Sequence, residues 1–200
     1  MIVKVCGITN AEDAAAAIAG GATAIGFNFY PRSPRYIAPE AAAQIATPPS
    51  VRRVGVFVNE PRATVEQIVA IAALDVAQLH GEEPLEEYPT SAAVWKAARV
   101  TGGLDLSAYW NGRTEALLLD GPAGDLYGGA GKTFDWSRAA VDSRRIILAG
   151  GLDASNVAAA IAAAHPWGVD ACSRIESAPG KKDHKKMNEF LQAAREALHL

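Results

Sequence analysis

The chain has 200 residues, half of them apolar and a fifth charged, and this composition predicts one domain with enough chain for a sizeable core. Its net charge of −3 gives no electrostatic reason to expect nucleic acid or an anionic membrane as a partner, and no apolar run reaches the roughly 18 residues of a membrane span. The two cysteines, Cys6 and Cys172, lack metal-ligand spacing, and no HExxH or paired CxxC motif occurs, so we expect reduced thiols in a cytoplasm and no metal.

Apolar strand-like runs alternate with alanine-rich or amphipathic runs along the whole chain. Strands are predicted at 2–6, 23–28, 52–58, 75–79, 93–98, 115–119, 145–149 and 168–172. Helices are predicted at 10–20, 38–46, 62–73, 82–87, 104–110, 135–140, 153–164 and 182–198. This order is typical of a parallel sheet, and we predict an α/β fold in which residues 1–200 form a single (β/α)8 TIM barrel. An open doubly wound sheet is the alternative. The barrel is favoured because no GxGxxG fingerprint follows the first strand.

The first predicted strand ends in a cysteine. Side chains alternate along a strand, so Lys4 and Cys6 share one face while Val3 and Val5 share the other. The valines suit the helix layer, so we expect Lys4 and Cys6 inside the barrel, with Cys6 at the end where such barrels have their active sites. A free cysteine that only packs is the alternative. Lys4 needs a partner inside the barrel, and we expect Asp170, on the closing strand, to be that partner.

A loop with two arginines follows the second predicted strand, at residues 27–36. The guanidinium groups of Arg32 and Arg35 are planar and bind carboxylates or phosphates bidentately. Pro31 and Pro34 stiffen this loop. It is therefore a candidate anion-binding segment, and a solvated loop with two exposed arginines is the alternative.

A carboxylic acid ends the sixth predicted strand, where Asp120 follows the apolar run 116–119. Loss of solvation favours the neutral, proton-donating form of a carboxyl group. Asp120 is therefore a candidate proton donor, and a helix cap or loop anchor is the alternative reading.

Two polar loops follow the seventh and eighth predicted strands. Gly150 and Gly151 come after the seventh strand, and Ser173 and Arg174 come after the eighth. In these barrels the same two loops commonly bind phosphate through backbone N–H groups, and glycine lets the backbone approach an anion closely. A plain turn is the alternative for the glycine pair. Two polar loops in these positions favour a phosphorylated ligand.

Eight short motifs in the right order give the chain a further resemblance. They are 4–9 (KVCGIT), 33–37 (SPRYI), 55–59 (GVFVN), 78–81 (QLHG), 118–120 (LLD), 128–136 (GGAGKTFDW), 150–152 (GGL) and 179–183 (PGKKD). With these motifs the chain closely resembles the phosphoribosylanthranilate isomerase family of tryptophan biosynthesis over nearly its whole length.

The resemblance implies an Amadori rearrangement of N-(5-phosphoribosyl)anthranilate to 1-(2-carboxyphenylamino)-1-deoxyribulose 5-phosphate, without cofactor or metal. It implies Asp120 as the general acid and Cys6 as the general base. It also implies that Arg35 holds the anthranilate carboxylate and that the loops at Gly150–Gly151 and Ser173–Arg174 hold the phosphate. The expected partner is this small phosphorylated aminosugar, in a cytoplasmic protein that is a monomer or a homodimer.

The chain departs from the family pattern at two positions. The family usually has Ser-Gly where this chain has Ser173-Arg174, so we expect the Arg174 side chain to close over the phosphate as an added clamp. A side chain that points to solvent while the backbone N–H binds the phosphate is the alternative. Cys172 stands where the family commonly has a small residue, and we interpret it as a buried filler.

Other functions remain open at the level of sequence. One is a Schiff-base aldolase with Lys4 or Lys96 as the nucleophile. Another is a non-catalytic phospholigand-binding barrel, and a third is a broader isomerase that also accepts the histidine-pathway aminoaldose.

Overall fold

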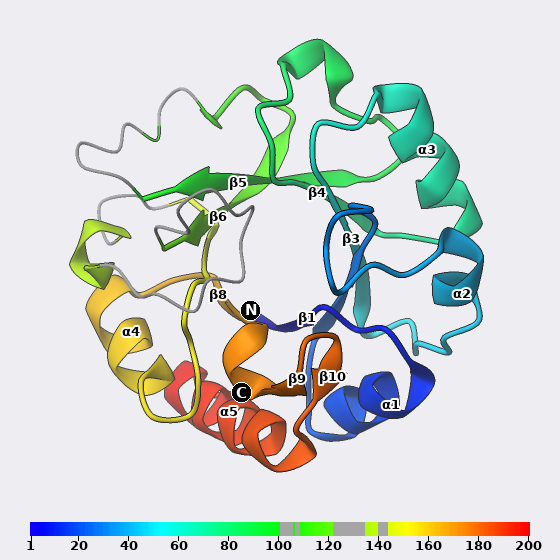
Figure 1. Cartoon of the computed structure of the whole chain (residues 1–200). Helices are drawn as coiled ribbons and strands as arrows, with labels where there is room; N and C mark the ends of the chain where they lie inside the picture. Colours follow the sequence, from blue (N-terminus) through cyan, green and yellow to red (C-terminus); the bar gives the residue numbers. More distant parts are fainter. Residues whose placement is uncertain (101–105, 107–108, 122–134, 140–143) are drawn as a thin grey trace.

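A closed barrel of eight parallel strands forms the centre of the molecule, as predicted (Figure 1). The computed structural model describes residues 1–100, 106, 109–121, 135–139 and 144–200. In sequence order, neighbouring strands pair all the way around, and β8 pairs with β1. The strands are β1 (Ile2–Cys6), β2 (Ala24–Asn28), β3 (Arg52–Phe57), β4 (Val76–Leu79), β5 (Ala93–Arg99), β6 (Thr114–Asp120), β7 (Ile146–Leu148) and β8 (Gly168–Ala171).

Helices surround the barrel (Figure 1). The α-helices are α1 (Ala11–Ala19), α2 (Pro39–Ala43), α3 (Arg62–Ile71), α4 (Val157–Ala164) and α5 (His184–Leu198). The described residues also include the short 3₁₀ helices η1 (Leu85–Glu87), η3 (Trp136–Ala139) and η4 (Ser173–Ile175). The start of α1 follows the expected chemistry, because the side chain of Asn10 accepts a hydrogen bond from the N–H of Asp13.

The prediction of eight full helices was wrong in part. At 82–87 the chain forms only the single turn η1, because Pro84 disfavours a helical conformation at Glu83. The Glu83 carboxylate instead accepts N–H groups of Asn59 and Gly81. At 135–140 the described residues form the short η3, and most of the expected helix at 104–110 lies outside the described residues.

The seventh predicted helix begins later than expected. It starts at Val157 rather than at residue 153. Asp153 uses its carboxylate to accept the N–H and hydroxyl of Ser155, and this local turn delays the helix.

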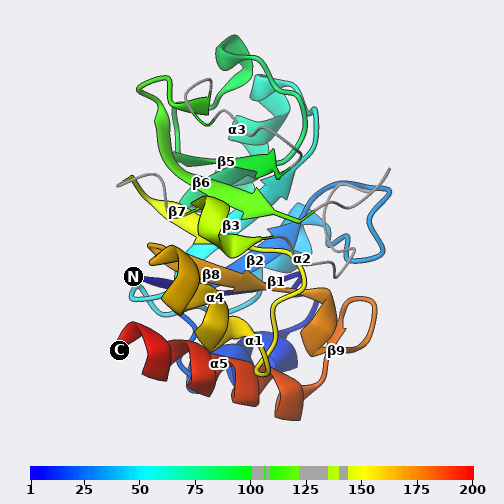
Figure 2. The ribbon, with the colours of Figure 1, turned by 90° about the vertical axis from the view of Figure 1, so that its left-hand side faces the viewer.

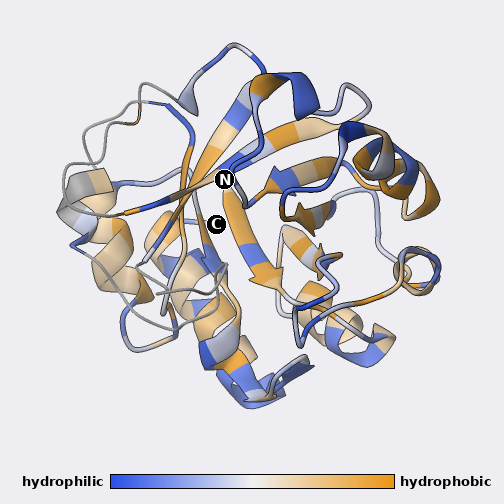
Figure 3. Ribbon diagram, turned by 45° about the horizontal axis from the view of Figure 1, so that its top comes forward, coloured by the Kyte–Doolittle hydropathy of each residue, from blue (hydrophilic) through white to orange (hydrophobic). Residues whose placement is uncertain are grey.

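Successive side chains of a strand point alternately out of and into the barrel, and this creates two separate apolar layers. Val3 and Val5 pack in the larger layer, between the barrel and its helices. Ile2, Val54 and Trp95 belong to a smaller cluster inside the barrel. The strands are predominantly hydrophobic in Figure 3, as expected for a parallel sheet that is covered on both faces.

A buried ion pair joins the first and last strands inside the barrel. Lys4 is fully buried, and its Nζ lies 3.0 Å from Oδ1 of Asp170, the partner predicted from the sequence. Burial by itself lowers the pKa of Lys4, but the Asp170 carboxylate and the Cys6 sulfur outweigh it and raise this pKa above its ordinary value. Burial raises the pKa of Asp170 to about 7, against the opposing effect of Lys4. In the register Lys4 faces Asp170, so the pair lies where β8 closes on β1.

A short antiparallel hairpin of β9 (Glu176–Ala178) and β10 (Lys181–Lys182) follows η4. In Figure 2 it lies at the end of the barrel toward which the parallel strands run. The two chain ends lie near each other at the opposite end (Figures 1 and 2). None of the described helices combines the length and the apolar character that a membrane crossing requires.

We predict that Asp170→Ala destabilises the protein by about 3–5 kcal/mol, because it leaves the Lys4 ammonium buried without its carboxylate. Urea unfolding followed by circular dichroism measures this free energy. Glu189→Ala is the matched control: it breaks an exposed i,i+4 pair with Lys185 and should cost no more than about 0.5 kcal/mol. Equal losses in the two variants would contradict the role of the buried pair.

Candidate active site

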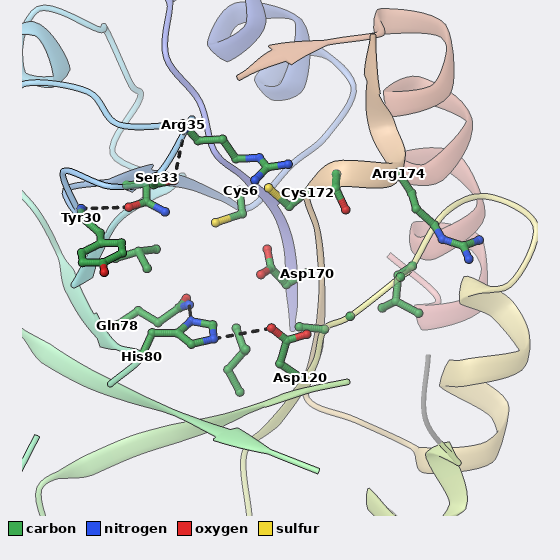
Figure 4. A pocket seen from close by; sticks show the side chains of 18 of the residues that line it. Cys6, Tyr30, Ser33, Arg35, Gln78, His80, Asp120, Asp170, Cys172 and Arg174 are labelled. Atoms are coloured by element: carbon green, nitrogen blue, oxygen red, sulfur yellow. Dashed lines mark hydrogen bonds and ion pairs between the residues drawn. The ribbon is translucent and has the colours of Figure 1, made fainter. Parts of the chain in front are cut away.

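One pocket opens at the carboxyl ends of the barrel strands (Figure 4). The structure brings together in its wall all the residues that the sequence singled out as the site: Cys6, Arg35, Asp120, Gly150, Gly151, Ser173 and Arg174. Among the described residues, no group of three or more His, Cys, Asp and Glu side chains is arranged to hold a metal ion.

Cys6 ends β1 with its side chain in this pocket. Gly26 on the neighbouring strand makes room for it, since a Cβ at Gly26 would lie 2.9 Å from the Cys6 sulfur. A hydrogen bond from the Cys172 thiol lowers the pKa of Cys6, and the positive charges of Lys4 and Lys182 lower it further, against the raising effect of burial. Cys172 remains the protonated partner, since its pKa is raised. Cys6 is therefore predisposed to be a thiolate.

We predict that iodoacetamide alkylates Cys6 with a pH midpoint clearly below about 8.5, the ordinary value for cysteine. The rate of alkylation rises with the thiolate fraction, so a lowered pKa moves the midpoint to lower pH. Cys172→Ala removes the hydrogen bond and should move the midpoint upward. Peptide mass spectrometry identifies the modified residue. An unchanged midpoint in the variant would exclude the Cys172 hydrogen bond as the cause.

Asp120 lies at the end of β6 and is mostly buried. The Nε2 atom of His80 is 3.5 Å from its Oδ2, and the Nδ1 atom of the same ring faces the side-chain amide of Gln78 at 3.3 Å (Figure 4). The buried Oε1 of Gln78 has no hydrogen-bond partner among the described residues. The pocket therefore holds a row of carboxyl, imidazole and amide groups, in which the amide oxygen can still accept a hydrogen bond.

Gln78 and His80 are two pocket residues that were not predicted as part of the site. The sequence could have indicated both residues, because side chains two positions apart along the fourth strand point to the same face. Gln78 is the polar residue of the apolar strand β4, and His80 follows it two positions later, just beyond the strand end. Side chains two apart point the same way, so a polar pair at this edge of the barrel indicates the pocket.

Arg35 lies in the pocket wall with its guanidinium held by an acid. Its Nε and Nη2 donate to the two carboxylate oxygens of Glu176 at 2.9 and 2.8 Å, and Lys182 Nζ lies 2.9 Å from the same carboxylate. Burial raises the pKa of Glu176, but the two cations lower it below its usual range. The three side chains together carry a charge of about +1, which suits an anionic ligand. Gly7, at φ +75°, leaves the space that Arg35 occupies, since a Cβ there would lie 2.8 Å from Arg35 Cδ.

Both expected phosphate loops border the pocket. Gly150 and Gly151 have φ of +81° and +64°, conformations that favour glycine. Arg174 is not among the described residues with positive φ, so its backbone suits a residue with a Cβ. Its Nη1 lies 2.9 Å from Oδ2 of Asp153, which ties the loop after β8 to the loop after β7. In Figure 4 its guanidinium extends away from Cys6 and Asp170.

Cys172 is not a buried filler, and this interpretation was wrong. The residue is partly exposed and lines the pocket, because the chain leaves β8 at Ala171 and turns into η4. Lys4 and Lys96, the alternative nucleophiles, do not line the pocket. Lys96 Nζ is buried against Glu83 at 2.8 Å and against the carbonyl of Leu79, just as Lys4 is held by Asp170. Neither lysine is placed to form a Schiff base with a ligand in the pocket.

Polar and reactive side chains gather at the carboxyl ends of the strands, while the interior below them is packed with apolar residues. This division defines the class of (β/α)8-barrel enzymes. A family model described as N-(5'-phosphoribosyl)anthranilate (PRA) isomerase matches residues 3–193. The chain therefore belongs to the N-(5'-phosphoribosyl)anthranilate isomerase family.

Individual relatives agree with this assignment. The chain is 68% identical to the N-(5'-phosphoribosyl)anthranilate isomerase of Solibacter usitatus over 99% of both chains. It is 40% identical to a phosphoribosyl anthranilate isomerase solved with reduced 1-(o-carboxyphenylamino)-1-deoxyribulose 5-phosphate, with a TM-score of 0.86 over 98% of this chain and 100% of the other. Monomers generated from the dimeric enzyme of Thermotoga maritima are 41% identical, with a TM-score of 0.85 over 98% and 100% of the two chains.

Proposed function

We propose that this chain catalyses the Amadori rearrangement of N-(5-phosphoribosyl)anthranilate to 1-(2-carboxyphenylamino)-1-deoxyribulose 5-phosphate in tryptophan biosynthesis. The observation that carries the proposal is that Cys6 and Asp120 line the same pocket from β1 and β6. Only β7 and β8 separate these strands on the shorter way around the barrel, so a sugar between the two residues meets an acid and a base.

The reaction needs a proton donor first. Asp120 in its acid form gives a proton to the furanose ring oxygen. The bond from C1 to that oxygen then breaks, and the lone pair of the anthranilate nitrogen forms the protonated Schiff base. His80 lies beside this carboxyl group, with its Nε2 3.5 Å from Oδ2 of Asp120.

The second step needs a base at C2. The Cys6 thiolate takes the C2 proton, and the electron pair of that bond moves toward the iminium nitrogen to give an enolamine. Tautomerisation of the enolamine gives the ketone. The lowered pKa of Cys6 supports this role, because an ordinary cysteine is only a few per cent thiolate at neutral pH. We place the reaction in the cytoplasm, since the base acts only as a reduced thiol.

The two ends of the substrate carry negative charge. We assign the anthranilate carboxylate to Arg35, because two of its five N–H groups bind Glu176 and fix the plane of the guanidinium. We assign the phosphate to the loops at Gly150–Gly151 and Ser173–Arg174. Support for the phosphate assignment comes from the positive φ of both glycines, which leaves their backbone open to a close anion.

The direct test is loss of anthranilate-type fluorescence when the purified protein is added to freshly made N-(5-phosphoribosyl)anthranilate. We expect first-order loss that is proportional to the amount of protein. A rate equal to that of the buffer alone would refute the proposed function. Size-exclusion chromatography on the same sample distinguishes a monomer from a homodimer like the dimeric relative of Thermotoga maritima.

We predict that Cys6→Ala and Asp120→Asn each lower kcat by at least about 10²-fold, because positioned proton transfers contribute roughly 10²–10⁴-fold each. Glu115→Gln is the matched control. It lies at the other end of β6, where its carboxylate pairs with Arg52 and Arg145, and its kcat should stay within a few-fold of wild type. A kcat near wild type in Cys6→Ala or Asp120→Asn would remove that residue from the mechanism.

Arg35→Ala should act on substrate binding and raise KM roughly ten- to a hundredfold, since a charge-assisted hydrogen bond contributes about 1.5–3 kcal/mol. Glu176 keeps Lys182 as a partner in this variant, so the fold should persist. Arg35→Lys retains the charge but lacks the planar guanidinium group. Its KM should lie between those of wild type and Arg35→Ala. Steady-state kinetics with an unchanged KM in Arg35→Ala would show that the residue is only part of the loop.

Arg174 requires a paired comparison, because its guanidinium is held by Asp153. If the guanidinium turns to the phosphate as a clamp, Arg174→Gly should raise KM about tenfold and weaken its salt dependence, as expected for a partly exposed charge. Asp153→Asn, which removes this ion pair, should then leave KM unchanged or lower it. Equal increases of KM in both variants would contradict the clamp and favour a bridge between the two loops.

A further inference from the structure

The closing of the barrel sets the two cysteines of the chain beside each other. In the pairing of β1 with β8, Lys4 faces Asp170 and Val5 faces Ala171. Cys6 and Cys172 directly follow this last pair, Cys6 as the final residue of β1 and Cys172 one position beyond the end of β8. Neighbouring strands lie about 4.8 Å apart, within the span of about 4.4–6.8 Å between Cα atoms in disulfides.

The side chains make use of this proximity. Both residues line the pocket, and the Cys172 thiol is close enough to Cys6 to lower the pKa of the Cys6 thiol (Figure 4). Gly7 leaves room for the second sulfur, since a Cβ there would lie 3.0 Å from Cys172 Sγ. Both thiols are therefore accessible to a small molecule that enters the pocket, and no bond joins them in this structure.

Positive charge surrounds the pair. Lys182 Nζ lies 4.0 Å from the Cys172 sulfur, and Lys4 lies beside Cys6. The interaction with Cys6 and loss of solvation raise the pKa of Cys172, and the positive charges of Lys182 and Arg35 oppose this increase. Cations stabilise a thiolate, and an accessible thiolate with a second thiol in reach is the arrangement found in redox-sensitive cysteine pairs.

We propose that Cys6 and Cys172 are a modification site, at which hydrogen peroxide drives formation of a reversible intramolecular disulfide. In the first step the Cys6 thiolate attacks a peroxide oxygen, and the O–O bond breaks. Hydroxide departs from the peroxide, and Cys6 becomes a sulfenic acid. In the second step the Cys172 sulfur attacks the Cys6 sulfur, the S–O bond breaks, and the hydroxide that leaves takes up the thiol proton as water. The two sulfurs together lose two electrons, and a dithiol reductant returns them.

Cys172 has two consequences in this reaction. The disulfide with Cys172 leaves Cys6 without the thiolate that acts as the base, so isomerase turnover should stop in the oxidised protein. Cys172 also captures the sulfenic acid before a second peroxide converts it to sulfinic acid, which thiols do not reduce. The site goes beyond the proposed function, and its formation is measured without any assay of turnover.

The test uses the reduced 200-residue chain, freed of reductant and treated with a tenfold molar excess of hydrogen peroxide, enough for two oxidation steps at each thiol. We expect the two free thiols to fall to none, with a mass loss of two hydrogens and no dependence on protein concentration. Trypsin digestion without reduction should yield peptides 5–32 and 146–174 as one linked species. Dithiothreitol should restore both thiols.

Cys172→Ser is the matched control, since it keeps a small polar side chain at this position. The same treatment should add two oxygen atoms to Cys6 in this variant, and dithiothreitol should not remove them. The proposal is wrong if wild-type Cys6 gains two oxygen atoms while Cys172 stays a free thiol. It is equally wrong if both thiols survive a dose that oxidises Cys6 in the variant, or if the only disulfide formed links two chains.

Discussion

The ion pair of Lys4 and Asp170 lies at the seam where the last strand meets the first, and much of the site depends on it. A charge inside a dry barrel is tolerated only with a close partner of opposite sign, and the register of β1 against β8 supplies one at 3.0 Å. The same register sets Cys6 at the mouth beside Cys172. The same lysine also lowers the pKa of Cys6. One buried contact therefore acts on both the closure of the fold and the chemistry of the thiol.

Two carboxylates near the pocket, Glu176 and Asp120, differ in the side chains that surround them. Glu176 is neutralised by Arg35 and Lys182, so it orients the arginine and is itself unable to act as a free base. Asp120 has no Arg or Lys partner among the described ion pairs; the imidazole of His80 lies 3.5 Å from it, and it faces the pocket. Two carboxylates at the same end of one barrel thus have different chemistry because their partners differ.

The sequence predicted the barrel because its eight apolar strands alternate with helical runs, a signal that needs no knowledge of distant contacts. The parity of the first strand likewise predicted the Lys4–Asp170 pair, which the structure confirms. Strand-end residues such as Cys6 and Asp120 meet in one pocket because the closing of parallel strands brings their carboxyl ends to one edge. The expected helix at 82–87 failed because Pro84 disfavours a helical conformation at Glu83, whose carboxylate instead binds the N–H of Asn59 and the ammonium of Lys96.

Other features were beyond the reach of pattern alone. Arg35 is held by Glu176, a residue 141 positions away, and no local signal reports such a pair. The same is true of Arg174 and Asp153, since nothing in the sequence indicates that the loops after β7 and β8 are joined by this ion pair. The motif at 128–136, which contributed to the family resemblance, lies largely outside the described residues.

Residues 1 and 200 lie near each other at the amino ends of the strands, on the side away from the pocket. A surface tether or a fused partner attached at either end therefore leaves the mouth open to substrate. Because the ends are neighbours, a short linker between them would yield a circular chain, and new ends opened in a different connection would give permuted forms of the same barrel. The layout makes the molecule a suitable building block for immobilised or multi-enzyme assemblies.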